Sequence, residues 1–598
     1  MSHIFPYWRK YKKSILIAIA FLSFEAFFDV LQPTIVAQII NLGVQNSDMD
    51  VVLRLGGLML LVTALLATCA VVRCVISSRV SQSFGADLRL GLFAKINSFS
   101  FETLGKKETA GLITRLTNDT SHLVMFTNGM MRIFVKSPLV LIGAFSMTLL
   151  LNFRLAIVLI AVTPIIGVLM YISMKVGFPL FNRMQQALDR NNSVIREYLS
   201  GVRVVKAYNT FTQETARFDD SNSNLAAAST TAMRVTGVFQ PIISFTINMG
   251  LVASLWLARD WVAAQEMNVG QIIAFINYMN QIMFSMGTIF MVYQQLIRAK
   301  ASAERIGEVL SEESDNITNL VNFENLEDLG NLESLGSLEN SQKSQNTVDS
   351  TANFAPPSIQ FENVTFHYNK TASKPILQDV SFKLPAGKTL GIIGSTGSGK
   401  TSLVQLIPGF YFPTSGTVKI AETPITTENA ADLRSLVAYV AQQNTLFYGT
   451  IADNIKMGKF DATAEEIEQA AKSACAHDFI TEIPDGYNAV IGQKGVNLSG
   501  GQRQRIGIAR ALLKKSSVLI LDDCVSAVDV ETESKIMAAV NAINPAPTCL
   551  MITQRISSVI NLPYVLVLDE GQVVGFGSHS ELMAKCTTYQ EIYHSQLI

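Results

Sequence analysis

The chain has 598 residues, of which 49% are hydrophobic and 16% are charged. Soluble domains carry about 25% charged residues, so this balance indicates a lipid bilayer and argues against a wholly soluble chain, while the length indicates several domains. The net charge of −1 gives no basis for nucleic-acid binding.

Six apolar segments are long enough to cross a hydrocarbon core, which takes roughly 20 apolar residues. They lie at 14–36, 55–76, 133–152, 155–175, 236–258 and 269–292. The first segment is longer than a signal-peptide core and has no convincing cleavage site, so we expect it to remain as a membrane helix. The long connections at 77–132 and 176–235 show helical periodicity, so we expect these membrane helices to continue well beyond the bilayer.

Basic residues predict the orientation of these spans. Lys and Arg cluster before the first span, in both long connections and after the sixth span. Because short cytoplasmic segments of membrane proteins are enriched in Lys and Arg, we expect these segments and both termini to be cytoplasmic. Residues 1–310 are therefore predicted to form an α-helical transmembrane domain.

Polar residues inside the spans are candidates for substrate contact. Glu25 and Asp29 lie four residues apart on one face of the first span. Acids in a membrane are costly and usually functional, so they could attract a cationic substrate or carry a proton, or simply bond a neighbouring helix. In the sixth span, Asn277 and Met283 could line a substrate pathway or pack between helices.

An acidic segment separates the membrane domain from the rest of the chain. Residues 311–350 contain nine acidic residues and one basic residue, and Leu recurs at every third position between 326 and 338. A period of three fits neither a helix nor a strand. We predict a flexible linker over 311–355, with a docking strip for a partner as the alternative.

From residue 356 to the C-terminus at 598, the pattern becomes that of a soluble α/β domain. Residues 359–366 alternate in polarity like a half-buried strand, and 389–393 form an apolar strand followed by a glycine-rich loop. The loop and the start of its helix comprise Gly394, Ser395, Thr396, Gly397, Ser398, Gly399, Lys400, Thr401 and Ser402. Such a loop curls its backbone N–H groups around phosphates, while Lys400 neutralises the β- and γ-phosphates and the Thr401 hydroxyl ligates Mg²⁺. ATP and Mg²⁺ are the predicted cofactors.

Two further motifs follow the phosphate loop. The buried strand 518–522 ends in Asp522, which is predicted to hold the Mg²⁺ shell. Before a basic helix at 503–513 lie Ser499, Gly500, Gly501 and Gln502, where a serine and glycine amides can meet a phosphate at a helix N-terminus.

The order of these motifs resembles the half-transporters of the ABC exporter family, in which six membrane helices precede one P-loop ATP-binding cassette. The resemblance covers nearly the whole chain. It implies that Tyr368 stacks on adenine, that Gln442 contacts Mg²⁺ and the attacking water, and that 526–529 cross a dimer interface. It also implies that helices at the tips of the two long connections, near 111–120 and 201–208, press into the cassettes.

In this family, ATP is held between the phosphate loop of one chain and the signature motif, here Ser499 to Gln502, of the other. The resemblance therefore implies a second half-transporter as partner. It also implies a lipid bilayer as the setting and a small molecule as the cargo.

Three positions depart from the family pattern. Asp523 occupies the place of the glutamate that polarises water, and Gln554 that of a histidine that contacts the γ-phosphate. Gln493 replaces a glutamate in the loop before the signature. An amide cannot carry the positive charge or relay a proton, and the shorter carboxylate is retracted by about 1.5 Å.

Both catalytic changes fall in one ATP site, while the signature lent to the other site is complete. This pattern resembles the degenerate-site subunit of heterodimeric bacterial multidrug exporters of the plasma membrane. We expect weak hydrolysis at this chain's own site and export of small amphipathic molecules. A homodimeric exporter, a siderophore-type importer with the exporter fold and an ATP-gated regulator remain alternatives.

Overall fold

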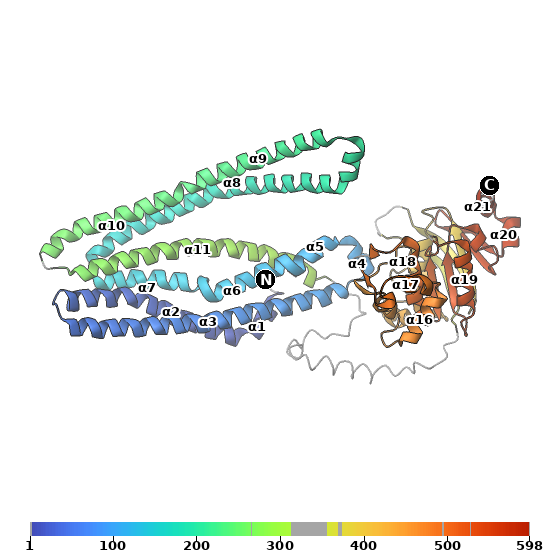
Figure 1. Cartoon of the computed structure of the whole chain (residues 1–598), viewed down its shortest axis with the longest axis horizontal. Coiled ribbons are helices and arrows are strands. Elements are labelled where there is room, and N and C mark those ends of the chain that lie inside the picture. The colour runs from blue at the N-terminus through green and yellow to red at the C-terminus, as the bar shows by residue number, and fades with distance from the viewer. Residues whose placement is uncertain are drawn as a thin grey trace. The chain divides into compact units, whose positions relative to one another are not determined.

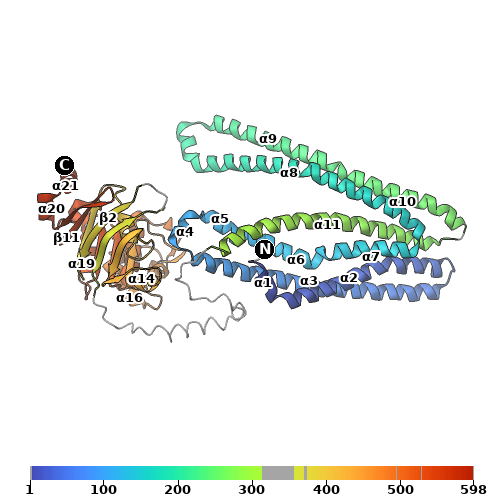
Figure 2. The same cartoon turned by 180° about the vertical axis from the view of Figure 1, so that it is seen from behind.

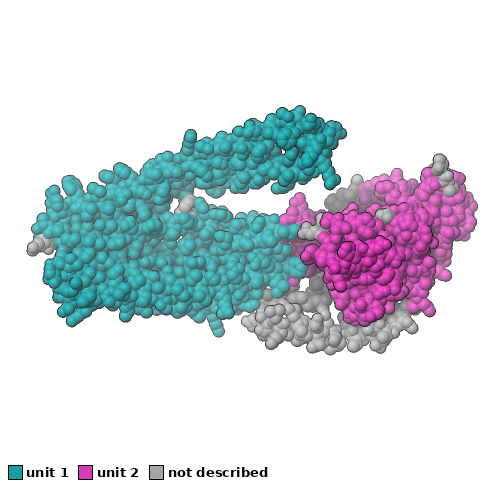
Figure 3. Space-filling model, viewed as in Figure 1, with its two compact units in different colours: residues 1–93, 113–311 teal, residues 94–112, 312–598 magenta. Residues whose placement is uncertain are grey.

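The computed structural model describes residues 3–264, 266–312, 356–368, 374–492, 495–526 and 528–596. The chain forms two compact units, which are coloured separately in Figure 3. The membrane unit comprises residues 1–93 and 113–311, and the cassette unit comprises residues 94–112 and 312–598. Nearly all of the predicted linker, and Gln493, lie outside the described residues.

The membrane unit is entirely helical. Its elements, some of which begin or end in the cassette unit, are α1 (Phe5–Lys10), α2 (Lys12–Gln38), η1 (Ile39–Val44), α3 (Met49–Asn97), α5 (Thr109–Thr114), η2 (Arg115–Asp119), α6 (Thr120–Gly129), η3 (Met130–Phe134), α7 (Lys136–Leu151), α8 (Phe153–Tyr208), α9 (Phe211–Gly237), α10 (Phe239–Ala263) and α11 (Val269–Leu310). Six helical runs are long and apolar enough to cross a membrane, namely Lys12–Val44, Met49–Asn97, Thr109–Leu151, Phe153–Tyr208, Phe211–Ala263 and Val269–Leu310. The prediction of six membrane helices is confirmed.

Several of these helices are much longer than a bilayer requires. Helix α8 has 56 residues, which corresponds to about 84 Å at 1.5 Å per residue, against about 30 Å of hydrocarbon core. The predicted continuation beyond the bilayer is therefore present. The C-terminal half of α8 and helix α9 run side by side as an arm, which stands off from the other helices of the unit (Figures 1, 2 and 3), whereas the N-terminal half of α8 packs against α10 and α7.

The arm contains little buried surface of its own. Helix α9 has 27 residues and buries only Ser221 and Ala232. Most stability of a helix in a folded protein comes from packing one of its faces, so a long helix with so few buried residues is incompletely packed within this chain.

The cassette unit is built around a six-stranded sheet in the order β12-β11-β3-β10-β9-β6. Its strands are β3 (Thr389–Gly394), β6 (Val437–Val440), β9 (Val518–Asp522), β10 (Thr548–Ile552), β11 (Tyr564–Asp569) and β12 (Gln572–Gly577). All neighbours pair in parallel except β11 and β12. Because parallel strands end at the same edge of a sheet, the residues that follow β3, β9 and β10 come together there.

A second, antiparallel sheet has the order β2-β1-β4-β5. Its strands are β1 (Ile359–Phe366), β2 (Leu377–Leu384), β4 (Ser415–Ile420) and β5 (Thr423–Pro424), and a third, two-stranded sheet contains β7 (Gly449–Thr450) and β8 (Val490–Ile491). Strand β1 has the bounds predicted from its alternating sequence, and its buried side chains recur mainly at alternate positions.

Helices cover the parallel sheet. They are α13 (Lys400–Gln405), α14 (Ala430–Ser435), α15 (Ile451–Lys456), α16 (Ala464–Ser473), α17 (His477–Glu482), α18 (Gly500–Leu513), α19 (Val530–Asn541), α20 (His579–Lys585) and α21 (Thr587–Gln596). The short helix α4 (Phe101–Lys106) also belongs to this unit, although it lies far from the cassette in sequence.

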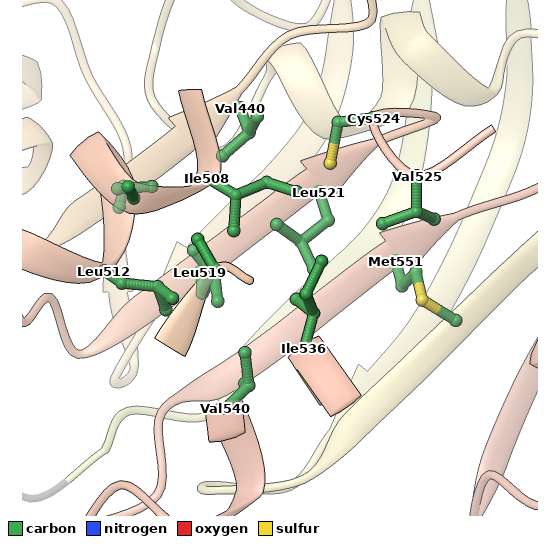
Figure 4. Packing of buried hydrophobic residues seen from close by; sticks show 14 of the residues in the cluster. Val440, Ile508, Leu512, Leu519, Leu521, Cys524, Val525, Ile536, Val540 and Met551 are labelled. Carbon is green, nitrogen blue, oxygen red and sulfur yellow. The ribbon is translucent and has the colours of Figure 1, made fainter. Parts of the chain in front are cut away.

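Strand β9 is fixed between two hydrophobic clusters. Leu519 and Leu521 pack in one cluster with Ile508 and Leu512 of α18 (Figure 4), whereas Ile520 points into the other. All five residues of the strand are buried, as expected for a central parallel strand. Burial of each of the four apolar side chains contributes about 1.5–3 kcal/mol, so they hold β9, which ends in Asp522, in place.

Candidate functional site

The glycine-rich loop follows β3 and leads into α13. Gly394, Gly397 and Gly399 have φ values of 156°, 84° and 97°, which side chains other than glycine rarely adopt. A Cβ at Gly394 would lie 2.0 Å from the Leu568 carbonyl oxygen. No Cβ contact limits Gly397, so there only the backbone conformation requires glycine. This curled backbone fits the predicted phosphate cradle.

Lys400 lies inside the loop. Its Nζ donates to the carbonyl oxygens of Gly394 and Ser395 at 2.9 and 2.6 Å, and approaches the Ser398 hydroxyl at 3.4 Å. Burial lowers the pKa of Lys400 from its usual value, and the nearby Asp523 carboxylate opposes this shift. The ammonium group is thus held in the middle of the loop, where it can neutralise bound phosphates, while Thr396 lies at the exposed tip.

Two of the three residues predicted to contact Mg²⁺, Thr401 and Asp522, are in direct contact. The Thr401 hydroxyl donates to Asp522 Oδ1 at 3.0 Å, and Asp522 is 1% exposed at the end of β9. Oxygen ligands of this kind are those that Mg²⁺ prefers, so the residues present fit the ion. Burial raises the pKa of Asp522, while hydrogen bonds from Tyr439 and Thr401 oppose the rise.

Tyr439 is a site residue that the sequence analysis missed. It lies on β6, which pairs with β9, and its hydroxyl donates to Asp522 Oδ2 at 2.7 Å. The carboxylate is therefore fixed through both oxygens, by Thr401 on one side and Tyr439 on the other. A buried tyrosine usually finds a hydrogen-bond partner, so its place in an apolar strand next to β9 was the available signal.

Asp523, in the place of the expected glutamate, has a constrained backbone. Its φ of 48° lies in the left-handed region, which is uncommon outside glycine but tolerated by Asp. Its N–H donates to the Ile552 carbonyl at 3.1 Å, and its carboxylate accepts from Gln442 Nε2 at 3.1 Å. Burial is the main cause that raises the pKa of Asp523. The structure thus brings together the two predicted residues Asp523 and Gln442.

Gln554 follows the neighbouring strand. Strand β10 pairs with β9 so that Ile552 lies opposite Asp522, and Gln554 comes two residues later with an exposed side chain. Its carbonyl accepts from Gln596 Nε2 at 2.6 Å. Asp523 and Gln554 therefore leave the same edge of the sheet from adjacent strands.

The predicted interface loop at 526–529 is tied to this edge. Arg555 donates to the carbonyls of Ser526 and Val528, each at 2.9 Å. Ala527 lies outside the described residues. Arg555, the residue after Gln554, thus holds the loop that follows Asp523. Both altered positions are therefore adjacent in sequence to this loop or to the residue that holds it.

Tyr368, the predicted adenine-stacking residue, precedes a gap in the described residues and is 41% exposed. Its hydroxyl lies 2.9 Å from the Ser402 hydroxyl, at the start of the helix that follows the phosphate loop. Its ring meets Tyr411 edge to face at 5.0 Å between centroids. The hydroxyl contact keeps the aromatic ring close to the phosphate loop.

The signature motif forms the N-terminus of α18. The Ser499 hydroxyl accepts from Gln502 N–H at 3.2 Å, and the Gln502 side chain accepts from Ser499 N–H at 2.9 Å. This reciprocal capping box explains why the helix begins three residues before the predicted basic stretch. Ser499 and Gly500 are exposed, whereas Gly501 is half-buried. Among the described residues, no hydrogen bond joins this motif to the phosphate loop.

An aromatic contact ties α4 to the core of the cassette unit. Phe101, the first residue of α4, lies 4.4 Å from Phe410 between ring centroids, and Phe410 meets Tyr439 at 5.5 Å. Because the Tyr439 hydroxyl donates to Asp522, a series of side-chain contacts runs from α4 to the carboxylate that is predicted to hold Mg²⁺. This contact could not be predicted from local sequence patterns, since Phe101 and Phe410 are far apart along the chain.

In the membrane unit, the two predicted acids are paired with cations of the same chain. Glu25 is 4% exposed and accepts from Arg73 Nε at 2.6 Å and Lys136 Nζ at 2.9 Å. Lys136 also pairs with Asp29 at 3.1 Å. The acids therefore join α2 to α3 and α7, as the helix-bonding alternative describes.

The two candidates in α11 differ from each other. Asn277 is exposed and donates to the Ile273 carbonyl of its own helix at 2.9 Å. Met283 is half-buried against the hydrophobic core of the membrane unit. Asn277 is thus the more accessible of the two.

The fold and the site together define a multi-pass membrane protein with a nucleotide-binding cassette. Residues 15–286 match the model of the ABC transporter transmembrane region, and residues 377–526 match the ABC transporter model. The chain is similar to the Bacillus subtilis protein YfiB, an uncharacterized ABC transporter ATP-binding protein, with 34% identity and coverage of 97% of this chain and 96% of the relative. The chain belongs to the ABC transporter family, so its cassette binds ATP, generally with Mg²⁺, to drive transport.

Other comparisons agree with this assignment. The Mycobacterium tuberculosis protein Rv1273c, also an uncharacterized ABC transporter ATP-binding protein, is 33% identical over 100% of this chain and 97% of its own length. The mouse mitochondrial potassium channel ATP-binding subunit is 29% identical over 88% of this chain and 70% of its own length. The solved structure of a bacterial Atm1-family ABC exporter with ATP bound has the same fold, with a TM-score of 0.76, 22% identity and coverage of 98% and 99%.

Proposed function

We propose that this chain is the degenerate-site half of a heterodimeric exporter. It holds ATP between its own phosphate loop and a partner's signature, hydrolyses it slowly, and completes the partner's working site with its own signature. The complex exports small amphipathic molecules across the bacterial plasma membrane, with both termini of this chain in the cytoplasm.

The single observation that carries this proposal is the edge formed by β9 and β10. Asp523 directly follows β9 and Gln554 lies two residues after the neighbouring strand β10, at positions where exporters of the family usually have a glutamate and a histidine. Misplacement of a catalytic group by about 1 Å can reduce the rate roughly 100-fold. An exposed amide at position 554 can donate a hydrogen bond but cannot supply charge. Because the changes at Asp523 and Gln554 both affect the catalytic step, they argue against a single tolerated substitution.

The rest of the nucleotide machinery supports binding without fast hydrolysis. Lys400 lies within a fully formed loop, and Thr401 and Asp522 already meet at the ion position. Gln442 donates a hydrogen bond to the Asp523 carboxylate. The short Asp523 side chain is therefore held against Gln442 and does not extend further outward. In this arrangement the chain's residues orient the nucleotide, while the proton of an attacking water lacks a well-placed acceptor.

Two surfaces of the chain support a second half-transporter as partner. The signature cap at Ser499 is exposed and forms no hydrogen bond with the phosphate loop among the described residues, so it is accessible to a nucleotide held by another chain. Helix α9 is the second surface, because it buries only two of its 27 residues. A partner that packs against the α8–α9 arm would supply the missing buried surface.

ATP turnover of the purified chain tests the proposal. We expect the chain alone to bind ATP and to hydrolyse it at least tenfold more slowly than an exporter with an intact site. Asp523→Asn should change this low rate little, because the carboxylate contributes little to it. Fast turnover that Asp523→Asn abolishes would contradict the degenerate-site assignment and favour a homodimeric exporter.

A second candidate function is ATP-dependent regulation of a channel. It is favoured by one observation, the similarity to the mouse mitochondrial potassium channel ATP-binding subunit over 88% of this chain. Membrane vesicles that contain the complex separate the two functions. ATP-dependent accumulation of a substrate against its gradient supports a pump. In inside-out vesicles, an exporter accumulates its substrate, whereas the siderophore-type importer does not.

A further inference from the structure

A polar cavity of about 470 Å³ lies within the membrane unit. Its lining comes from α2, α3, α6, η3, α7 and α11. We propose that this cavity binds the anionic head group, a carboxylate or phosphate, of an amphiphile. The binding site itself does not depend on the proposed export function, but its use as a substrate site does.

The charge balance of the cavity is positive. Arg73, Arg132 and Lys136 line it together with one acid, Glu25. Asp29, which pairs with Lys136, is the second acid of this cluster. Three cations against two acids leave a surplus of one positive charge, so a ligand that neutralises the cavity carries a negative charge. In a setting of low dielectric this preference is stronger than it is in water.

Arg132 is the cation that carries this surplus. Glu25 is bonded to both Arg73 and Lys136, whereas Arg132 is exposed and forms no hydrogen bond or ion pair with any residue in the described part of the chain. Its guanidinium group offers five N–H donors in a planar fork, which matches the two oxygens of a carboxylate or phosphate. Arg132 is therefore free to bind a ligand without breaking an existing pair.

Unused hydrogen-bonding capacity at the cavity also points to a ligand. Arg73 is 7% exposed, donates through Nε to Glu25, and leaves a buried Nη1 with no partner among the described residues. Buried polar atoms normally find partners, and each exception calls for an explanation. A bound polar group that draws the Arg73 fork toward the cavity would satisfy Nη1.

The remaining lining suits an apolar tail. Met125 and Ile133, at opposite sides of Arg132 in sequence, line the cavity and are 59% and 39% exposed. Arg132 and Lys136 also lie next to the start of the third predicted span, whose preceding connection is expected to be cytoplasmic. Two sources of an anionic amphiphile reach this level, a transported molecule and an anionic phospholipid of the inner leaflet.

Photolabelling of the full chain in phosphatidylcholine nanodiscs tests the proposal. The probe is a palmitate analogue with a photoreactive diazirine in its tail, and its methyl ester is the uncharged control. Mass spectrometry then quantifies labelling of the segment 120–134. We expect the acid to label this segment about tenfold more than the ester, as one charge-assisted contact implies.

Three variants locate the effect. Arg132→Gln should lower labelling by the acid to the level of the ester, while Arg132→Lys should retain most of it. Arg183→Gln removes an exposed cation of α8 away from the cavity lining and should change nothing. Equal labelling by acid and ester, or full labelling of Arg132→Gln, would overturn the proposal.

A second nanodisc identifies the source of the ligand. If phosphatidylglycerol in the disc lowers labelling by the acid several-fold, the cavity holds a lipid head group; if labelling is unchanged, it selects a transported amphiphile. The labelling assay needs neither ATP nor a partner chain, so a negative result does not affect the degenerate-site proposal. Conversely, a negative result in the ATP turnover test does not affect the proposal that the cavity binds an anionic head group.

Discussion

Within one cassette, the phosphate loop and the edge formed by β9 and β10 show opposite degrees of completeness. The loop retains every group that the family uses, with glycine backbones in the required conformations and Lys400 at its centre. At the edge, Asp523 and Gln554 lie where the resemblance to the family predicts a glutamate and a histidine. On our proposal, nucleotide binding depends on the glycine backbone and on Lys400, which are both present, whereas hydrolysis depends on the reach of two other side chains. The two properties can therefore be lost separately.

The largest effect is expected from Lys400→Ala. Removal of the ammonium group from the loop should weaken ATP binding by roughly 100-fold, because contacts to charged groups contribute about 1.5–3 kcal/mol each. Binding of a fluorescent ATP analogue to the purified chain measures this. Lys383→Ala, at an exposed lysine paired with Glu422, is the matched control and should bind normally. Unchanged ATP binding in Lys400→Ala would show that Lys400 does not bind the phosphates.

Ser499→Ala should separate the two ATP sites. In a heterodimer with the proposed partner we expect it to lower total ATP turnover by roughly 10- to 100-fold, because on our proposal Ser499 contacts the partner's nucleotide. ATP binding to this chain's own loop should not change.

Loss of the helix cap alone costs about 1 kcal/mol, so this variant needs a matched control. Ser578→Ala removes the same kind of capping box from α20. Equal loss of turnover in both variants would mean that Ser499 acts only through the stability of its helix.

Tyr439→Phe removes the hydroxyl that fixes Asp522 but keeps the aromatic ring. One such hydrogen bond contributes about 1 kcal/mol, so Mg²⁺-dependent ATP binding should weaken about fivefold, while binding without Mg²⁺ stays the same. Titration of Mg²⁺ at a fixed concentration of the ATP analogue measures the change. Tyr564→Phe, at a half-buried tyrosine of β11, is the control. If both variants bind Mg²⁺ alike, Tyr439 does not position the carboxylate.

The smallest effect is expected from Phe101→Ala, which removes the ring contact with Phe410. Aromatic pairs contribute about 0.5–1.5 kcal/mol beyond their buried area, so amide hydrogens of 101–106 should exchange several-fold faster. ATP binding should change little, because the rings of Phe410 and Tyr439 lie between Phe101 and Asp522. Phe460→Ala, at a phenylalanine that is 77% exposed, should leave this segment unaffected. Unaltered exchange after Phe101→Ala would show that α4 is held by other contacts.

Much of the fold was predictable because its signals are local. The spans are runs of apolar residues, β1 alternates in polarity, and the loop after β3 and the end of β9 carry motifs of fixed spacing. The sequence analysis did not identify Tyr439, Phe101 or Phe410, because their contacts join segments that are distant along the chain. It noted Glu25 and Asp29 but could not show that Arg73 and Lys136 neutralise them, since that depends on how three helices pack.

The double variant Asp523→Glu, Gln554→His gives the most direct test of the central claim. Because this chain's own signature is complete, two copies of the variant can form two sites with every catalytic group. ATP turnover of the chain purified alone should therefore rise at least tenfold over the slow parent chain. A parent chain that already hydrolyses ATP as fast as the double variant would contradict the account.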